Sequence, residues 1–364
     1  MELGPRHDEL FPAWLHLAEK QRHSIDFFVA PLHQSRDIFS LLESPRPRWF
    51  LTKSQDLGNS PVLKILQNLR SMVLRLRALF LLNTNYDLVI ANSVEPENYH
   101  WSFFRYINKP ILTVLHNGNV VVTNKKYENI RTKSKYSVVV LSKHIQEYLA
   151  RHDVASFPIH PYLELKASTF ENCQKHETTF CVQGYMHLHR RNYDSLLKAA
   201  SSLKERKVKC TFKIVGRLNR SARHMQERIK ELEISEYFAF VSDAVSYRDY
   251  YREIYSCRFL LLLIDDSRMI YQPFFEDKCS SSLHVALGLD VIPVANRKLS
   301  EIYEIADCCV PYESDDVYSG VMSALSYESK EIDSLVDGVQ RTRQRFADES
   351  VSAFGRAIES ATGG

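Results

Sequence analysis

Short, continuous apolar runs alternate with helix-period segments along the whole chain, and this alternation constrains the fold more than any other feature. A run of Val, Ile, Leu and Phe without polar interruption indicates a strand that is buried on both faces of a parallel sheet. Ten runs predict strands, at 25–30, 48–51, 88–92, 111–116, 137–141, 179–183, 211–215, 239–241, 259–264 and 291–294. The predicted fold class is α/β, with two Rossmann-like parallel-sheet domains.

The chain is too long for one ordinary hydrophobic core. At 364 residues it predicts two domains that face each other across a cleft. Periodicity is lost over residues 158–173 (PIHPYLELKASTFENC), which include Pro158 and Pro161. We therefore expect a hinge there, with a first domain over 1–165 and a second over 166–345.

Composition and charge exclude several classes of protein. The formal net charge of +3 is too small to indicate a nucleic-acid partner. The seven cysteines contain no C-x-x-C pair, so neither a disulfide framework nor a zinc site is indicated, and a cytoplasmic protein is expected. The N-terminal residues include acids rather than the basic and apolar segments of a signal peptide, and the longest apolar run, 259–264, is too short to span a membrane.

Ligands of open parallel sheets bind at the carboxyl ends of the strands, so the residues that follow each strand are candidate site residues. The segment 274–296 (FFEDKCSSSLHVALGLDVIPVAN) places Lys278 and Ser280–Ser282 at the start of a predicted helix. Serines cap helices, and the N–H groups of a first turn attract anions, to which Lys278 could add a charge-assisted contact. The alternative is that the serines only cap the helix and that Glu276, Asp277 and Lys278 are ordinary loop residues.

Three other strand ends carry weaker signals. Gly184 follows a strand and precedes Arg190, Arg191 and a helix, which is either a phosphate-facing arrangement or a tight turn with two solvated arginines. Gly216 and Arg217 follow another strand, and His116, at the end of a first-domain strand, is followed by Asn117 and Gly118. No G-x-G-x-x-G pattern occurs, which disfavours a Rossmann-type oxidoreductase.

The order of these segments resembles the nucleotide-sugar-binding domain of GT-B glycosyltransferases, especially glycosyltransferase family 4 (glycosyl transferases group 1). The resemblance covers about residues 178–311 and rests on VQGYMHLHRRNYDSLLKA, IVGR, FAFVSDAVSYRDYYREIYSCRFLLLL, the acidic loop and VALGLDVIPVAN. Glu276 occupies the position of the first of the family's two glutamates, with Ala286, Leu287, Gly288, Pro293 and Val294 in register. In this fold a terminal helix commonly returns to the first domain, which we expect of residues 346–364.

The resemblance implies a role for each candidate residue. Glu276 matches the glutamate that lies against the donor sugar, Ser281 and Ser282 fall where a helix start binds the diphosphate, and Arg191 matches the base that neutralises the leaving group. His116 matches a first-domain histidine that contacts the donor sugar. The other candidates for donor and diphosphate binding are Gly184, Arg190, Arg217, Lys278 and Ser280.

Two positions depart from the family pattern. His284 stands where the family's second glutamate grips the ribose, and Tyr185 stands where an arginine follows the strand glycine. His284 is the candidate nucleoside-binding residue, and Lys278, Arg190 or Arg217 could compensate for Tyr185.

The chemistry expected of such a site needs no cofactor. A departing nucleoside diphosphate develops negative charge, which a helix N-terminus and fixed cations can stabilise without a metal. No D-x-D motif is placed to hold a metal, because Asp265 and Asp266 directly follow a strand. Retention of anomeric configuration is implied by the resemblance alone.

The segment 62–83 (VLKILQNLRSMVLRLRALFLLN) is amphipathic and basic. It is either a core-packed helix with a basic outer face or a helix that lies on an anionic membrane surface. Residues 330–362 also have a helical pattern.

Taken together, the sequence predicts a hexosyltransferase-type enzyme of carbohydrate biosynthesis that moves a sugar from a nucleotide-diphosphate donor, such as a UDP- or GDP-sugar, to a glycan or other acceptor. Residues 1–165 would select the acceptor. The alternative is a glycosyltransferase-like module that binds a partner or carbohydrate and has lost turnover, which the residues at 185 and 284 motivate.

Overall fold

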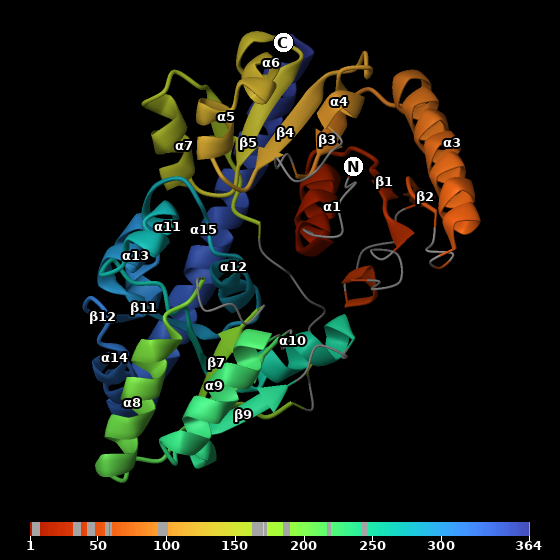
Figure 1. Ribbon diagram of the computed structural model, residues 1–364. Coiled ribbons are helices and arrows are strands. Elements are labelled where there is room, and N and C mark those ends of the chain that lie inside the picture. The colour runs from red at the N-terminus through yellow and green to blue at the C-terminus, as the bar shows by residue number, and fades with distance from the viewer. Residues whose placement is uncertain are drawn as a thin grey trace. The chain divides into compact units, whose positions relative to one another are not determined.

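The structure of the protein is a computed structural model (Figure 1). The structure describes residues 1, 8–31, 38–41, 48–54, 58, 60–93, 101–161, 170, 173–184, 190–216, 220–241 and 246–363. The chain divides into two compact units. The first unit comprises Met1–Pro161 and Ala347–Gly364, and the second comprises Tyr162–Phe346.

The second unit is built on a six-stranded parallel sheet with the order β12-β11-β10-β7-β8-β9. Counted from the first strand of the unit, this order is 6-5-4-1-2-3, which is the Rossmann arrangement. The strands are β7 (His176–Gln183), β8 (Thr211–Val215), β9 (Phe238–Val241), β10 (Cys257–Leu261), β11 (Ile292–Asn296) and β12 (Val310–Tyr312). Their carboxyl ends therefore form one edge of the sheet, where the candidate loops begin.

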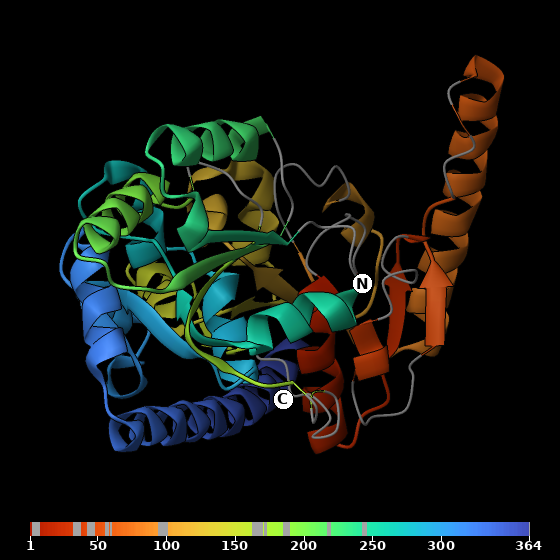
Figure 2. The ribbon, with the colours of Figure 1, turned by 90° about the horizontal axis from the view of Figure 1, so that it is seen from below.

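Helices cover both faces of this sheet (Figure 2). On one face, the core joins strand residues such as Phe212 and Ile214 to α8 (Tyr193–Glu205), α9 (Arg220–Glu231) and α14 (Val317–Ser326). Side chains alternate between the faces of a strand, so Lys213, which lies between Phe212 and Ile214, points to the opposite face. The remaining helices of the unit are α10 (Tyr247–Tyr255), α11 (Pro273–Glu276), α12 (Ser281–Gly288) and α13 (Arg297–Ile302).

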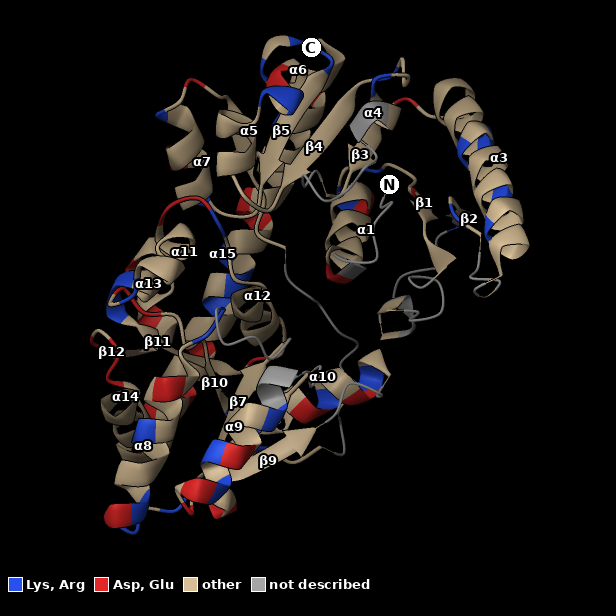
Figure 3. Ribbon diagram, viewed as in Figure 1, with Lys and Arg blue, Asp and Glu red and all other residues tan. Residues whose placement is uncertain are grey.

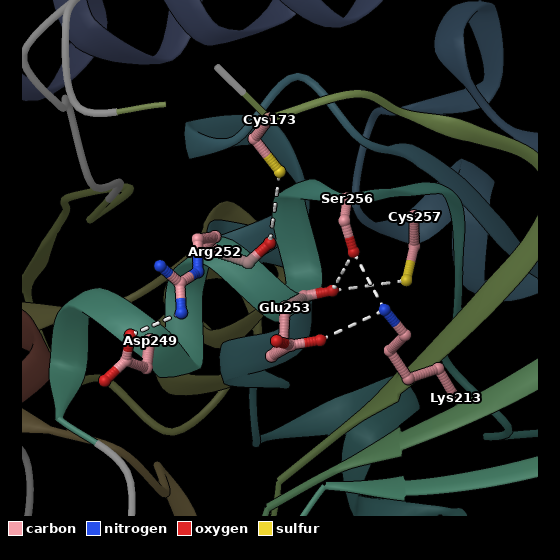
Figure 4. A network of polar contacts seen from close by, with 7 residues as sticks. All are labelled: Cys173, Lys213, Asp249, Arg252, Glu253, Ser256 and Cys257. Carbon is pink, nitrogen blue, oxygen red and sulfur yellow. Dashed lines mark hydrogen bonds and ion pairs between the residues drawn. The ribbon is translucent and has the colours of Figure 1, made fainter. Parts of the chain in front are cut away.

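A network of polar contacts attaches α10 to the sheet (Figure 4). The Nζ of Lys213 lies 3.1 Å from Oε2 of Glu253 and donates to Oγ of Ser256 at 2.9 Å. Lys213 is largely buried and Glu253 partly so. Because a buried ammonium needs compensation, this ion pair fixes α10 against β8.

The first unit contains a four-stranded parallel sheet and a separate parallel pair. The sheet has the order β3-β4-β5-β6, and β1 pairs with β2. The strands are β1 (Asp26–Val29), β2 (Arg48–Leu51), β3 (Val89–Ala91), β4 (Ile111–Leu115), β5 (Tyr136–Val140) and β6 (Ser156–Pro158). The helices are α1 (Phe11–Lys20), α3 (Pro61–Asn85), α4 (Trp101–Phe104), α5 (Asn119–Thr123), α6 (Glu128–Thr132) and α7 (Lys143–Ala150).

The last helix, α15 (Ser329–Thr362), contributes residues to both units. From Ala347 onward it belongs to the first unit, where the rings of Phe354 and Trp14 lie 6.3 Å apart. Short 3-10 helices lie at Asp8–Leu10, Ile38–Leu41, Lys125–Tyr127, Ser235–Tyr237, Met269–Tyr271 and Ala306–Cys308.

The structure contains each of the ten predicted strands, with ends that differ by at most three residues. It adds β6 and β12, which the sequence analysis did not predict. Both are three residues long and contain a proline, Pro158 and Pro311. They lie at the edges of their sheets, where a missing N–H donor is tolerated.

The prediction of a helix over 62–83 is confirmed by α3, but the core-packed interpretation of it is wrong. Only Ala78 and Leu82 of its 25 residues are buried. Ser54 contacts Ser71 and Gln67, which lie on the same side of α3 as the buried Ala78 and Leu82, and this side faces its own unit. The opposite side is apolar and exposed. Within the described part of the chain, no helix is long and apolar enough to cross a membrane.

Candidate active site

Two glycines bring the ends of β7 and β8 unusually close together. Gly184 follows β7 with φ +106°, and Gly216 follows β8 with φ +145°. A Cβ atom at Gly216 would lie 2.2 Å from the carbonyl oxygen of Gly184, so a side chain there would collide with backbone. Both positions therefore require glycine, and a Cβ at Gly184 would lie 3.1 Å from the guanidinium of Arg191.

Arg191 is buried beneath these turns and joins three elements. Its guanidinium donates to the carbonyl oxygens of Gln183, at the end of β7, and of Leu262, just after β10, the latter at 3.1 Å. It also donates to Oγ of Ser282 in the first turn of α12 at 2.9 Å. No carboxylate of the described residues forms an ion pair with Arg191. Its positive charge is thus held, without a neutralising acid, beside a helix N-terminus.

Two asparagines, Asn192 and Asn296, form hydrogen bonds to the aspartates that follow β10. Asn192 donates from Nδ2 to Asp265 at 2.8 Å, and its side chain accepts from the N–H of Ser195 as the N-cap of α8. Asn296 donates to Asp266 at 3.1 Å and caps α13 in the same way. Neither asparagine was among the predicted site residues, although an Asn before a helical pattern is a recognisable cap signal.

The serine turn opens α12, as predicted. Ser280 is the N-cap and is buried, Ser281 is exposed, and Ser282 is fully buried and bonded to Arg191. The N–H of Ser280 donates to the hydroxyl of Tyr303 at 3.2 Å, and that hydroxyl also contacts the carbonyl oxygens of Phe274 and Lys278. Burial raises the pKa of Tyr303 well above its usual value, so the phenol stays protonated as a fixed link between the loop and α13.

The loop before α12 carries the two charged candidates. Glu276 ends α11, is exposed, and accepts a hydrogen bond from Gln272 at 2.7 Å. The ammonium of Lys278 lies over the ring of Phe274, 5.1 Å from its centroid. The carboxylate therefore faces solvent, where a ligand could reach it, while a cation–π contact restrains the lysine.

His284 is buried on α12, and its Nε2 lies 3.4 Å from the sulfur of Cys279. The imidazole thus packs against the loop that leads into its own helix. This placement gives His284 a structural contact that the sequence could not reveal, because Cys279 had no signal of its own.

The other candidates are distributed as follows. Arg190 is exposed directly before Arg191. Arg217, as well as Tyr185, lies outside the described residues. His116 belongs to the first unit, where it follows β4, is buried, and has Nε2 3.2 Å from the carbonyl oxygen of Asn92. The structure therefore brings together Gly184, Arg191, Ser282 and the remainder of the serine turn.

This arrangement can bind an anion. The first N–H groups of a helix have no partner within the helix, and the helix dipole adds a partial positive charge there. Arg191 reinforces that charge, and the glycine turns leave the backbone open to close approach. Among the described residues, no three His, Cys, Asp or Glu side chains cluster so that they could hold a metal ion.

No protein-family model and no curated protein matches the sequence. Solved structures do match over nearly the whole chain. HepE from Anabaena, in complex with UDP, aligns with a TM-score of 0.60 at 13% identity and covers 99% of both chains. A glycosyltransferase from Rickettsia africae aligns with a TM-score of 0.58 at 11% identity, covering 99% of this chain and 97% of the other.

The chain has the GT-B fold. The matching structures are not all glycosyltransferases by name, since the N-terminal domain of a trehalose-6-phosphate phosphatase from Candida albicans aligns with a TM-score of 0.55 at 10% identity. That match covers 99% of this chain and 96% of the other. At identities of 10–13%, the likeness to these structures shows the fold alone.

Proposed function

We propose that this GT-B protein is a glycosyltransferase that moves a sugar from a nucleoside-diphosphate donor to an acceptor. The observation that carries the proposal is the buried Arg191, which has no ion-pair partner among the described residues and is bonded to Ser282 at the start of α12. Burying a guanidinium without a carboxylate is costly, so its position suits a site in which an anion supplies the compensation. A diphosphate leaving group is such an anion.

The proposed mechanism uses the residues of the second unit. As the bond to the diphosphate breaks, the charge that develops is stabilised by the N–H groups of Ser281 and Ser282 and by the field of Arg191, with Lys278, Arg190 and Arg217 as further cations. Glu276 is proposed to lie against the sugar, whose anomeric carbon becomes positively charged. We propose metal-independent transfer with retention, as in family 4, and no cofactor.

We propose a UDP-sugar as the first donor to test, because HepE was crystallised with UDP and with UDP and glucose. The family resemblance supports a contact of His284 with the nucleoside, and a contact of His116 with the donor sugar. The first unit would select a glycan or other acceptor. All seven cysteines are free thiols, which supports the proposed cytoplasmic setting.

The experiment measures sugar transfer and donor hydrolysis over a panel of UDP-, GDP- and other activated sugars. With the donor that works, Glu276→Gln is expected to lower kcat by about 100-fold, because it removes a charge that acts in the transition state. The matched control is Glu236→Gln, which changes an exposed acid just before β9, at the opposite end of its strand from the site. Full activity of Glu276→Gln would remove this carboxylate from the mechanism.

A second candidate function is a nucleotide- or carbohydrate-binding module without turnover. It is favoured by His284, which replaces an expected acid and packs against Cys279. The phosphatase match is also consistent with a GT-B unit serving as one domain of a larger protein. Calorimetric binding of UDP without release of UDP from any donor in the panel would support this candidate and contradict the enzyme.

A further inference from the structure

The outward side of α3 is a continuous apolar face. Six large side chains at spacings of three or four residues are 51–66% exposed. They are Val62, Ile65, Leu69, Met72, Leu76 and Phe80. This spacing places them on one side of a helix, opposite the side that Ser71 and Ala78 turn toward the first unit. At a rise of about 1.5 Å per residue, the face extends over about 27 Å from Val62 to Phe80.

The charges of α3 are all of one sign. Its charged residues are Lys64, Arg70, Arg75 and Arg77, and residues 57–86 contain no Asp or Glu. Figure 3 shows α3 with basic segments and no acidic ones. Arg70 and Arg77 are exposed and seven residues apart, which places them together along one border of the apolar face.

An exposed apolar face on a helix whose charged residues are all basic matches an anionic lipid surface. The apolar side chains would enter the boundary between the headgroups and acyl chains of a bilayer, while the arginine stems extend toward anionic headgroups. Two copies of α3 paired through this face would bring Arg70 and Arg77 near their counterparts, with no acid on the helix to oppose them. The helix does not meet the requirements of a membrane span.

We propose that α3 lies flat on an anionic lipid surface and attaches the protein to it as a peripheral membrane protein. The proposal is independent of the glycosyltransferase proposal, since it rests on the first unit alone. The apolar face would contact the acyl chains, and Arg70 and Arg77 would contact the anionic headgroups.

The test is flotation of the full chain with vesicles of phosphatidylcholine alone and of phosphatidylcholine with 30% phosphatidylglycerol. Binding is expected with the anionic vesicles, weaker at high salt and at least tenfold weaker with the neutral ones. The double variant Leu69→Ser/Leu76→Ser should abolish binding, and Arg70→Gln/Arg77→Gln should weaken it at least fivefold. Both variants alter exposed side chains, so circular dichroism should remain that of the native protein.

The matched control is Arg223→Gln/Lys230→Gln on α9, which also removes two exposed cations seven residues apart. It should bind like the unaltered protein. A direct readout is Phe80→Trp, whose emission should shift to the blue and be quenched by brominated lipid. Failure of the native chain to float with anionic vesicles would overturn the proposal. So would a dimer that Leu69→Ser/Leu76→Ser dissociates without any vesicle binding, because the face would then serve self-association.

Discussion

At Gly216 the backbone geometry of the site admits only glycine. Its φ of +145° is unfavourable for any side chain, and a Cβ would lie 2.2 Å from the carbonyl oxygen of Gly184. We expect Gly216→Ala to lower the free energy of unfolding of the second unit by about 3 kcal/mol or more, because dihedral strain and the backbone collision add. Urea unfolding followed by circular dichroism measures this change.

The control for Gly216 is Gly58→Ala, which separates the two causes. Gly58 also has a positive φ, +105°, but the nearest atom to its Cβ is 4.0 Å away on Leu63. Only the dihedral cost applies there, about 1 kcal/mol. Equal losses for the two variants would show that the turns after β7 and β8 do not approach as closely as the structure indicates.

The position of Arg191 could be predicted from the sequence, but its contacts could not. The residues after Gly184 left open whether Arg191 faces a phosphate or is a solvated arginine of a tight turn, and the family resemblance implied the first. Its hydrogen bonds to Gln183, Leu262 and Ser282 reach residues up to 91 positions from Arg191 in the chain. Such contacts depend on the tertiary arrangement of the strand ends, which no local pattern contains. The same holds for His284 and Cys279, whose side chains meet only because the loop folds back onto α12.

At the scale of elements, the attachment of α10 to the sheet depends on one partly buried ion pair. Lys213 and Glu253 are 15% and 30% exposed, respectively. Lys213→Ala leaves the carboxylate without its partner in a partly desolvated position. We expect the free energy of unfolding of the second unit to fall by about 1–3 kcal/mol, measured by urea unfolding.

The exposed ion pair between Lys204 and Glu233 is the control for the partly buried pair between Lys213 and Glu253. Lys204 and Glu233 lie 3.2 Å apart but are 37% and 84% exposed. Solvent screens such a pair, so Lys204→Ala should cost no more than about 0.5 kcal/mol. If the two lysine variants lose the same stability, burial does not set the strength of the Lys213 contact.

The elements themselves were largely predictable, because strands buried on both faces leave continuous apolar runs in the sequence. The two exceptions, β6 and β12, are short edge strands interrupted by Pro158 and Pro311, and their pairing comes from the neighbouring strand rather than from their own composition. The existence of α3 was also predictable. Which of its sides faces the protein was not, since an amphipathic pattern gives the same helix whether its apolar side meets a core or a lipid surface.

At the scale of the whole molecule, the GT-B fold leaves one helix shared between the two units. The last part of α15 completes the core of the first unit. Its buried side chains there include Ala353, Phe354 and Ala357, and its backbone carbonyl at Val351 accepts from Gln21 at 3.0 Å. The residues that complete the core of the first unit therefore come after the whole of the second unit in the sequence.

This arrangement predicts that damage to the end of α15 affects the first unit selectively. Phe354→Ala removes a buried ring that packs 6.3 Å from Trp14, and it should lower the free energy of unfolding of the first unit by about 3–5 kcal/mol. The control is Arg356→Ala, which changes an exposed neighbour whose guanidinium contacts only Ser352 in the described structure. This variant should lower the free energy of unfolding by at most about 0.5 kcal/mol.

Differential scanning calorimetry of both variants measures the unfolding transitions, and calorimetric titration with UDP tests the proposed site in the second unit. Phe354→Ala should move one transition to lower temperature while UDP binding at 25 °C stays unchanged, because every residue proposed to bind the diphosphate belongs to the other unit. A parallel loss of UDP affinity would instead mean that the two units fold and bind as one.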